Sequence, residues 1–355
     1  MSEKVLMKGN EAIAEAAIQA GCHHYFGYPI TPQTEVAAYM AKRMPKIGGT
    51  FLQAESEVSA INMVIGVAST GKRVMTSSSS PGVSLKAEGI SYLAGCDLPA
   101  VVVNVQRGGP GLGGIQPSQS DYFQSTKGGG HGDYRNIVLA PASVQEMASL
   151  TVKAFDLADK YSMVSMILAD GTMGQMMEPV SLDVGEVKTY EKPWALTGTK
   201  CEREHNIVNS LYLKPEELEV KNFERYEKYK SIEENEVMYE EYLMDDAEVC
   251  VVAFGITSRV AKNAINEARA NGVKVGMIRP ITLWPFPKKV LADAADKCKA
   301  FICVEMNMGQ MIEDVELAIR CKKPVYLCNR VGGMIPSPEE VLAKINEVNE
   351  NGGAF

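Results

Sequence analysis

The sequence predicts an α/β protein in which a first domain with a parallel sheet is followed by a smaller α/β domain. The first observation is that helical segments alternate with short, nearly continuous apolar segments such as AVVVNVQR at residues 100–107. Strands this apolar, separated by helices, indicate a parallel sheet that is buried on both faces. The second observation is that the alternation stops near residue 183 and resumes near residue 248. We therefore expect three parts, which are residues 1–182, 183–246 and 247–355.

The expected elements of the first part follow one another in a regular order. Helices are expected where apolar residues recur at helical spacing, and Gly21 and Gly71 follow the ends of two of them. Strands are expected in the apolar segments between the helices. The expected helices are residues 10–19, 32–44, 56–70, 81–95 and 144–161, and the expected strands are residues 23–28, 50–53, 73–80, 100–107, 136–141 and 162–170.

The second and third parts differ sharply in composition. Residues 183–246 are dense in charge with scattered tyrosines and phenylalanines, which fits a solvated helical segment between two domains. In residues 247–355 the apolar alternation returns and predicts a second α/β domain. Its expected strands are residues 249–255, 273–278, 301–306 and 324–333, and its expected helices are residues 258–272, 312–321 and 336–348.

Composition and charge exclude several classes of protein. The chain has 355 residues and a formal net charge of -8, which argues against a nucleic-acid or anionic-membrane partner. No apolar run approaches the roughly 20 residues that a membrane-spanning helix needs. The first residues, MSEKVLMKGNEA, lack the apolar core of a signal peptide, so the expected location is the cytoplasm.

The eight cysteines do not have the spacing of a metal centre. No two of them form the pattern C-x-x-C, whereas zinc and iron–sulfur sites usually recruit thiolates in close pairs. Most of them lie in apolar strands, where a small thiol packs well. We therefore expect structural thiols and no metal site in this chain.

The expected binding edge of the first sheet is formed by the carboxyl ends of its parallel strands, where ligands gather in such sheets. In the motif GYPITPQTE, Thr31 stands between two prolines, where its hydroxyl group is expected to cap a helix and also to be presented to a ligand. The loops expected at this edge are Tyr28–Thr31, Ala54–Glu57, Ser77–Gly82 and Arg107–Gly114.

The fourth loop contains GPGLGG, which satisfies the pattern G-x-G-x-x-G from Gly109 to Gly114. A dinucleotide site is therefore one alternative, but it requires a helix that begins within the glycines. The loop continues instead into IQPSQSDYF and KGGGHGDY, which have little helical periodicity. A glycine-rich loop that covers a site fits the sequence better.

Other polar residues have ordinary structural explanations when each is considered alone. Arg107 ends a strand, where its planar guanidinium group suits a carboxylate ligand as well as an ion pair. Glu57 lies in the first turn of a helix, where the helix dipole stabilises an acid, and the same holds for Glu55. His131 with Asp133, the five methionines between residues 163 and 177, and Asp170–Gly171–Thr172 are explained by a polar loop, core packing and a turn.

Taken together, the motifs resemble a known family. GYPITPQTE, QAESEVSAINMVIGVASTGKRVMTSSSSPG, NVQRGGP and HGDYRNIVLAP occur in this order. They resemble the alpha subunits of the 2-oxoacid:ferredoxin oxidoreductases, which are thiamine diphosphate enzymes, and the similarity covers nearly the whole chain. VEMNMGQM in the third part resembles the transketolase carboxyl-terminal type of domain. The run from QRGGPGLGG to IVLAP looks most like the branched-chain, 2-oxoisovalerate-type members.

The resemblance implies a divided active site. The first domain would be the pyrimidine-binding half of a thiamine diphosphate site, and a beta subunit would hold the diphosphate and Mg²⁺. The magnesium motif of that family begins G-D-G, which this sequence lacks. Gamma and ferredoxin-like delta subunits, [4Fe-4S] clusters on partner subunits, coenzyme A as co-substrate and ferredoxin as electron acceptor are implied as well.

The resemblance also assigns roles to individual residues. Glu57 matches the glutamate that hydrogen-bonds the pyrimidine ring of the cofactor. Thr31 matches the threonine that contacts substrate, and Arg107 matches the arginine that faces the 2-oxoacid carboxylate. Tyr28, Pro29 and Ser80 are expected to bind the cofactor together with Glu57.

The substrate and the class of activity leave alternatives. The loop Gly108–Ser118 lacks an additional basic residue for a second substrate carboxylate, which favours an aliphatic substrate over 2-oxoglutarate. A pyruvate-specific enzyme is a further alternative within the family. A nucleotide-dependent dehydrogenase and a scaffold subunit with a decayed site are alternatives of other classes.

Overall fold

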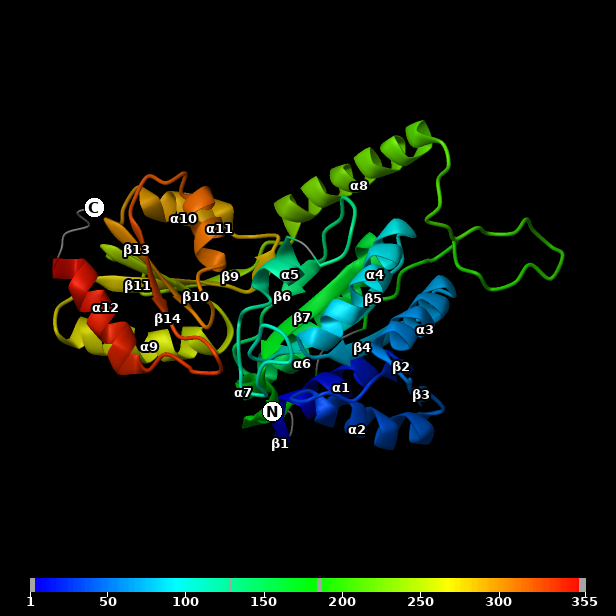
Figure 1. Ribbon diagram of the computed structural model, residues 1–355, viewed down its shortest axis with the longest axis horizontal. Coiled ribbons are helices and arrows are strands. Elements are labelled where there is room, and N and C mark those ends of the chain that lie inside the picture. Colours follow the sequence, from blue (N-terminus) through cyan, green and yellow to red (C-terminus); the bar gives the residue numbers. More distant parts are fainter. Residues whose placement is uncertain (1–3, 128, 184–186, 351–355) are drawn as a thin grey trace.

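The computed structural model describes residues 4–127, 129–183 and 187–350 and contains two main sheets, as Figure 1 shows. The predicted α/β class with parallel sheets is confirmed. The larger sheet has six parallel strands and one antiparallel strand, β12, at its edge. In spatial order, its strands are β12 (Thr282–Trp284), β6 (Ile137–Leu139), β7 (Val164–Asp170), β5 (Ala100–Gln106), β4 (Val74–Ser78), β2 (His24–Gly27) and β3 (Thr50–Gln53).

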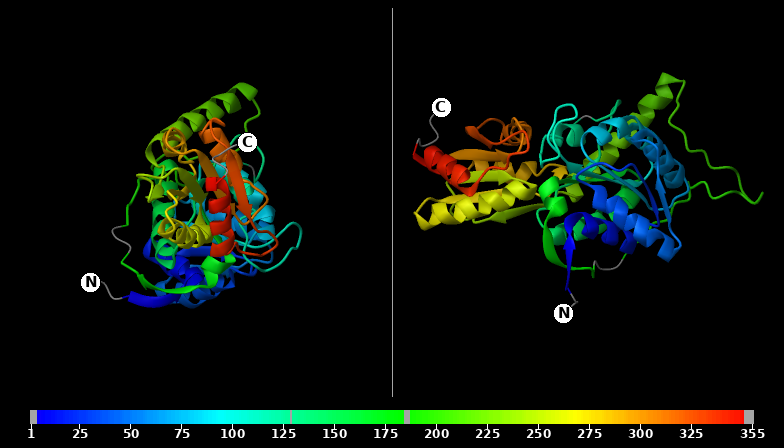
Figure 2. Two further views of the ribbon diagram at one scale, coloured as in Figure 1. Left: turned by 90° about the vertical axis from the view of Figure 1, so that its left-hand side faces the viewer. Right: turned by 60° about the horizontal axis from the view of Figure 1, so that its bottom comes forward.

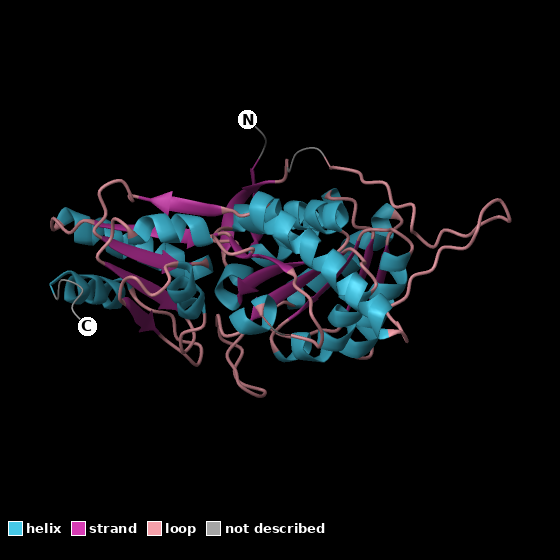
Figure 3. Cartoon of the chain, turned by 90° about the horizontal axis from the view of Figure 1, so that it is seen from above, coloured by secondary structure: helices cyan, strands magenta, loops and turns pink. Residues whose placement is uncertain are grey.

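Helices cover both faces of this sheet, which explains why its central strands are buried (Figure 3). α3 packs against α4, and α1 packs against α2 and α6. β4, β5 and β7 are buried along their whole length. The helical elements of this half are α1 (Gly9–Gln19), α2 (Thr34–Arg43), η1 (Met44–Ile47), α3 (Glu57–Ser69), α4 (Pro81–Gly95), α5 (Tyr122–Thr126), α6 (Val144–Tyr161) and α7 (Gly171–Gln175).

The smaller sheet has five strands, of which only the edge strand β9 is antiparallel. α9 (Gly255–Ala270) and α12 (Pro338–Glu350) cover one face, and α10 (Lys288–Ala295) and α11 (Met311–Ala318) cover the other (Figure 1). In spatial order, its strands are β14 (Val325–Asn329), β13 (Ala300–Glu305), β10 (Val249–Ala253), β11 (Val275–Pro280) and β9 (Tyr239–Tyr242).

The two sheets are connected by more than the chain between them. β12 belongs to the last third of the sequence, yet it pairs with β6 of the larger sheet. β1 (Lys4–Lys8) and β8 (Met177–Ser181) form a separate two-stranded antiparallel ribbon. The predicted domain boundaries at residues 182 and 246 stay predictions. Because β12 lies beyond residue 246 and pairs with β6, the larger sheet contains strands from both sides of these boundaries.

The charged middle of the sequence contains an extended segment, one long helix and, near its end, β9 of the smaller sheet. α8 (Pro215–Asn235) is largely exposed and buries only Arg225, Tyr229 and Ile232. The segment before it projects away from the body of the molecule (Figures 1 and 2). None of the helices in the described residues is both long and apolar enough to cross a membrane.

Candidate active site

The four predicted loops come together because β5, β4, β2 and β3 are consecutive strands of the larger sheet. These strands are parallel, so their carboxyl ends lie at one edge. Tyr28 follows β2, Glu57 follows β3, Ser80 follows β4 and Arg107 follows β5. The topology therefore brings all four to the edge at which ligands bind in this class of fold.

Arg107 connects two of these loops through its buried side chain. Its Nη1 donates to the carbonyl oxygen of Thr31 (3.0 Å), and its Nη2 donates to the carbonyl oxygen of Leu112 (3.1 Å). Arg107 is 7% exposed, and its Nε is buried without a hydrogen-bond partner among the described residues. A buried guanidinium group with an unused donor is suited to binding a carboxylate.

Thr31 does not cap a helix, so that part of the sequence-based prediction is wrong. α2 begins at Thr34, and the preceding residue, Gln33, makes no side-chain cap. The carbonyl oxygens of Thr31 and Pro32 are instead occupied by Arg107 and by Asn10 Nδ2 (2.8 Å), which hold this stretch as a turn. Thr31 is exposed, and its hydroxyl group is accessible at the edge of the sheet.

Tyr28 and Pro29 are exposed next to this turn, and Gln33 fixes their position. Gln33 Nε2 donates to the carbonyl oxygen of Tyr28 (3.2 Å), and its Oε1 accepts from the hydroxyl group of Ser77. The Tyr25 hydroxyl also bonds Ser77 Oγ, at 2.7 Å. This buried network attaches the loop after β2 to the end of β4.

Glu57 is the first residue of α3, and Ser56 caps the helix by accepting from Ser59 N–H (3.2 Å). Glu57 is 6% exposed, and its carboxyl group makes no hydrogen bond or salt bridge within the described part of the chain. A Cβ atom at Gly82 would lie 2.7 Å from Glu57 Oε1, so the absence of a side chain at Gly82 makes room for the carboxyl group. A buried carboxyl group without a protein partner is unusual and is suited to a ligand.

Ser80 joins the loop after β4 to Arg107 and to Asp121. Its hydroxyl group donates to Asp121 Oδ2 (2.6 Å) and accepts from Arg107 N–H (3.0 Å). The φ of Ser80 is 25°, a conformation that side-chain-bearing residues seldom adopt and that recurs at functional sites. Burial raises the pKa of Asp121, against the hydrogen bonds from Ser80 and Asn104. Ser78 Oγ and Ser79 Oγ, just before this turn, are buried without partners in the described structure.

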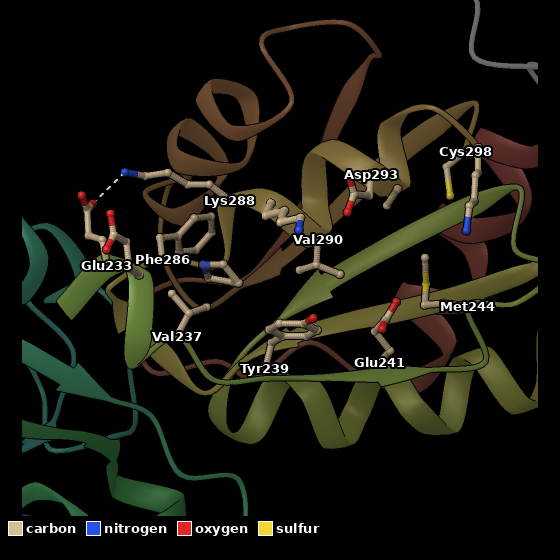
Figure 4. A pocket seen from close by; sticks show the side chains of 15 residues that line it. Glu233, Val237, Tyr239, Glu241, Met244, Phe286, Lys288, Val290, Asp293 and Cys298 are labelled. Atoms are coloured by element: carbon tan, nitrogen blue, oxygen red, sulfur yellow. Dashed lines mark hydrogen bonds and ion pairs between the residues drawn. The ribbon is translucent and has the colours of Figure 1, made fainter. Parts of the chain in front are cut away.

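A cavity of about 710 Å³ opens beside Ser80 between the two halves of the molecule. The larger-sheet half contributes Ser80, Asp121 and the glycine-rich loop, and the smaller-sheet half contributes Met306 and Gln310. A separate cavity of about 650 Å³ lies between β9 and α10 and contains none of the predicted site residues. Figure 4 shows that apolar side chains such as Phe286 and Val290 line it together with charged ones.

The glycine-rich loop does not have the structure of a dinucleotide site. No helix begins between Gly108 and Ser120, and the next helix, α5, is five residues long. The loop closes on itself, because Gly108 N–H donates to the carbonyl oxygen of Gln116 (2.9 Å) and Gly114 N–H donates to that of Gly108 (2.9 Å). The structure thus lacks the helix N-terminus that the dinucleotide alternative requires.

The remaining polar candidates lie outside the site or have structural roles. His131 and Asp133 are exposed in a loop. Asp170 caps α7, accepting from Thr172 N–H (2.8 Å) and Met173 N–H (3.0 Å). The described residues contain no group of three or more histidine, cysteine, aspartate or glutamate side chains that could hold a metal ion.

Sequence reasoning missed two polar residues close to this site, Asp121 and Lys86. Lys86 is fully buried, and its Nζ donates to Thr76 Oγ1 (2.7 Å) and to the carbonyl oxygen of Ser77 (2.9 Å). A signal was present in the sequence, because Lys86 stands four residues after Gly82 and four before Ile90, on the apolar stripe of α4. Asp121 has no such signal, because it lies in an irregular segment.

Comparison with known proteins agrees with this arrangement. The family described as "Pyruvate flavodoxin/ferredoxin oxidoreductase, thiamine diP-bdg" matches residues 15–243, which is more than half of the chain. The chain belongs to the 2-oxoacid:ferredoxin oxidoreductase family. A second family, "Pyruvate:ferredoxin oxidoreductase core domain II", matches residues 247–341.

Individual members of the 2-oxoacid:ferredoxin oxidoreductase family are similar over nearly the whole chain. The ketoisovalerate oxidoreductase subunit VorB of Methanothermobacter marburgensis is 53% identical over 344 residues, which cover 97% of each chain. The 2-oxoglutarate synthase subunit KorA of the same organism is 36% identical over 378 residues, covering 97% of this chain and 99% of KorA.

A solved member has the same fold. It is the 2-oxoglutarate:ferredoxin oxidoreductase from Magnetococcus marinus with 2-oxoglutarate, coenzyme A and succinyl-CoA bound. Its TM-score is 0.87 at 29% identity, over 98% of the present chain, which spans 65% of that longer chain.

Family membership places a thiamine diphosphate-binding domain at residues 15–243 of this oxidoreductase chain. All of the predicted site residues lie within these bounds. The part that each of them plays stays a prediction, and it is developed below as a proposal.

Proposed function

We propose that this chain is the alpha subunit of a coenzyme A-acylating 2-oxoacid:ferredoxin oxidoreductase. Its substrate would be a branched-chain 2-oxoacid, 2-oxoisovalerate, which is oxidatively decarboxylated to acyl-CoA and CO₂ while ferredoxin is reduced. The observation that carries the proposal is the buried carboxyl group of Glu57, which has no hydrogen-bond or salt-bridge partner in the described structure and follows a strand at the same sheet edge as the Thr31–Arg107 contact. The identity of 53% to a ketoisovalerate oxidoreductase subunit supports the choice of substrate.

The residues present fit the pyrimidine half of thiamine diphosphate. An aminopyrimidine ring offers nitrogen atoms that hydrogen-bond a carboxyl group, and the Glu57 carboxyl group has that capacity unused among the described residues. When bound, thiamine diphosphate supplies the thiazolium carbon chemistry that decarboxylation of a 2-oxoacid needs. Tyr28, Pro29 and Ser80 would border the cofactor, and Glu57 would hold a proton at its carboxyl group against the ring.

The substrate would be held by Arg107 and Thr31. The Arg107 Nε is buried and has no described partner, so a 2-oxoacid carboxylate can accept a charge-assisted hydrogen bond from it. Because Arg107 also holds the Thr31 carbonyl, substrate binding and the position of the Thr31 hydroxyl group are coupled. Both groups act by orientation of the reacting carbonyl carbon.

The proposed enzyme requires partner subunits. A beta subunit would supply the diphosphate site with Mg²⁺, and gamma and ferredoxin-like delta subunits would complete the complex and carry [4Fe-4S] clusters. The sequence supports this division, because the G-D-G motif that would begin a magnesium site is missing. Coenzyme A would accept the acyl group.

The test is an assay of the reconstituted complex against a panel of 2-oxoacids, with ferredoxin and coenzyme A present. We expect the highest kcat/KM with 2-oxoisovalerate. Glu57→Gln should lower kcat by more than about 100-fold, because the glutamine amide has a similar volume but cannot give and take a proton as a carboxyl group does. The exposed neighbour Glu55 supplies the matched control, Glu55→Gln, for which turnover should be nearly unchanged. A preference for 2-oxoglutarate or pyruvate would move the substrate assignment, and near-wild-type turnover of Glu57→Gln would remove the proposed mechanism.

A further inference from the structure

Lys86 is a fully buried lysine on the second turn of α4, beneath the candidate site. Its three N–H donors have two described acceptors, Thr76 Oγ1 (2.7 Å) and the carbonyl oxygen of Ser77 (2.9 Å), and both are uncharged. An ammonium ion in such a place is costly unless a negative charge lies nearby. Burial lowers the pKa of Lys86 to about 7, and the charge of Glu57 counteracts this shift.

Glu57 is placed to act on Lys86 across the contact between α3 and α4. Glu57 lies against Gly82 at the start of α4, and Lys86 follows one turn later on the same face of that helix. The two groups form no salt bridge within 4.0 Å in the described chain, so their interaction acts through space. Both residues are buried, and an interaction between buried charges is screened far less than one at the surface.

The other groups around Lys86 do not provide a charge. β4 presents Thr76 and Ser77, which do not titrate, and Ser77 Oγ is bonded to the hydroxyl group of Tyr25 from β2. Burial raises the pKa of Tyr25 to about 12, so this phenol is neutral. Glu57 is the charged side chain that acts on the Lys86 ammonium group within the described residues.

β7 also packs against α4, and its titratable residue is Asp170 at its end. The Asp170 carboxyl group accepts from the N–H groups of Thr172 and Met173, and it is not among the charges that act on Lys86. On α4 itself, Glu88 is exposed and bonded by the Tyr92 hydroxyl group (3.0 Å). Neither carboxyl group competes with Glu57 for Lys86.

We propose that Lys86 is the buried counter-charge of Glu57 and thereby a positioning residue of the active site. It contacts neither substrate nor cofactor, and it acts by balancing the negative charge of the buried Glu57 carboxyl group whenever that group has given up its proton. The part that this pair plays in turnover rests on the proposed function of Glu57.

The test of the pair is a double-mutant cycle on the full-length chain without cofactor, with unfolding in denaturant at pH 6.5 as the readout. We compare the change in the unfolding equilibrium constant that Lys86→Met causes in the wild type and in the Glu57→Gln variant. The change should favour folding more in the Glu57→Gln background, by at least about fivefold. The difference should shrink as the pH is raised to 9.5, because Lys86 is then neutral. The control Lys42→Met, at an exposed position on α2, should give equal effects in both backgrounds. Equal effects of Lys86→Met in both backgrounds would overturn the pairing.

Glu57→Gln alone gives the same test if Lys86→Met does not fold. Because the folded-state pKa of Lys86 is below that of an unfolded lysine, stability should rise with pH above about 7. Without the charge of Glu57, this rise should begin at a lower pH. A curve that does not move would contradict the pairing.

The role in turnover is tested separately in the reconstituted complex. Lys86→Met should lower kcat by about tenfold, shift its pH dependence and leave the KM for the 2-oxoacid nearly unchanged, whereas Lys86→Arg should retain part of kcat. An unchanged kcat and pH profile would remove the positioning role. Failure of the proposed function would give a different result. The reconstituted complex with Glu57→Gln would then keep its turnover, and the double-mutant cycle on the cofactor-free chain could still show coupling between Glu57 and Lys86.

Discussion

Glu55 and Glu57 are the same residue type, two positions apart at the start of α3, and they have opposite environments. Glu55 is exposed and accepts a hydrogen bond from the Ser59 hydroxyl group (2.6 Å), which lowers its pKa. Glu57 is buried and has no such partner in the described structure. The helix dipole acts on both, so it cannot explain why one of them is buried. Burial without a partner is what marks Glu57 as the functional carboxyl group.

At the same scale, Arg107→Ala should chiefly raise the KM for the 2-oxoacid. Loss of one hydrogen bond to a charged group costs about 1.5–3 kcal/mol, or roughly 10- to 150-fold in KM. Steady-state kinetics of the reconstituted complex measure this, with the exposed Arg320→Ala as control. An unchanged KM would exclude Arg107 from the substrate carboxylate.

At the scale of elements, Asp170, which the sequence analysis explained by a turn, helps to connect the two halves of the molecule. Its carboxyl group caps α7, and it also accepts a hydrogen bond from the backbone of Ile256 in the first turn of α9. Gln119 makes a second connection between the two halves. Its Nε2 donates to the carbonyl oxygen of Phe254 (2.8 Å), and its Oε1 accepts from Met306 N–H (3.1 Å). These polar contacts fix the smaller sheet against the larger one beside the 710 Å³ cavity.

Asp170→Asn should change how the stability of the folded chain depends on pH. Burial raises the pKa of Asp170 to about 6, so between about pH 4 and 6 the folded chain holds a proton that the unfolded chain has lost. The free energy of unfolding of the wild type therefore falls by up to about 3 kcal/mol as the pH rises through this window, and that of Asp170→Asn should not fall in this way. Denaturant unfolding from pH 4 to 7 measures the difference, with the exposed Asp133→Asn as control. Parallel curves for the wild type and Asp170→Asn would contradict the expectation.

For the whole molecule, the dominant feature is a site edge that the described chain leaves open. Thr31, Tyr28 and Pro29 are exposed, whereas Glu57 and Arg107 behind them are buried. The exposed edge is where a second subunit would close the site in the proposed complex. β12, which comes from the last third of the chain, pairs with β6 at the end of the larger sheet opposite β3.

The isolated chain should therefore bind thiamine diphosphate weakly. The proposed beta subunit holds the diphosphate and Mg²⁺, which are the strongly charged part of the ligand, so the pyrimidine half retains only the weaker contacts. Calorimetry should give an affinity at least about tenfold lower for the isolated chain than for the chain with its beta partner, or about 1.4 kcal/mol. Tight binding by the isolated chain would contradict the divided site.

The sequence by itself determined the α/β class, the order of the main elements and the four loops of the binding edge. Periodicity and apolar runs suffice for much of this, because α4 and α6 were predicted with their observed bounds and the apolar run at residues 100–107 contains the buried strand β5. Short elements such as β12, α7 and β1 carry too few residues to show a period, so they were missed.

Only the tertiary structure decided which polar groups are buried and what they contact. It placed the Thr31 and Pro32 carbonyls on Arg107 and Asn10, which removes the helix cap that the sequence favoured. It separated Glu57 from Glu55, and it brought Lys86 beneath the site from a different helix. The physical reason is that burial and long-range contacts depend on how strands order themselves in the sheet, and local sequence spacing carries no information on that order.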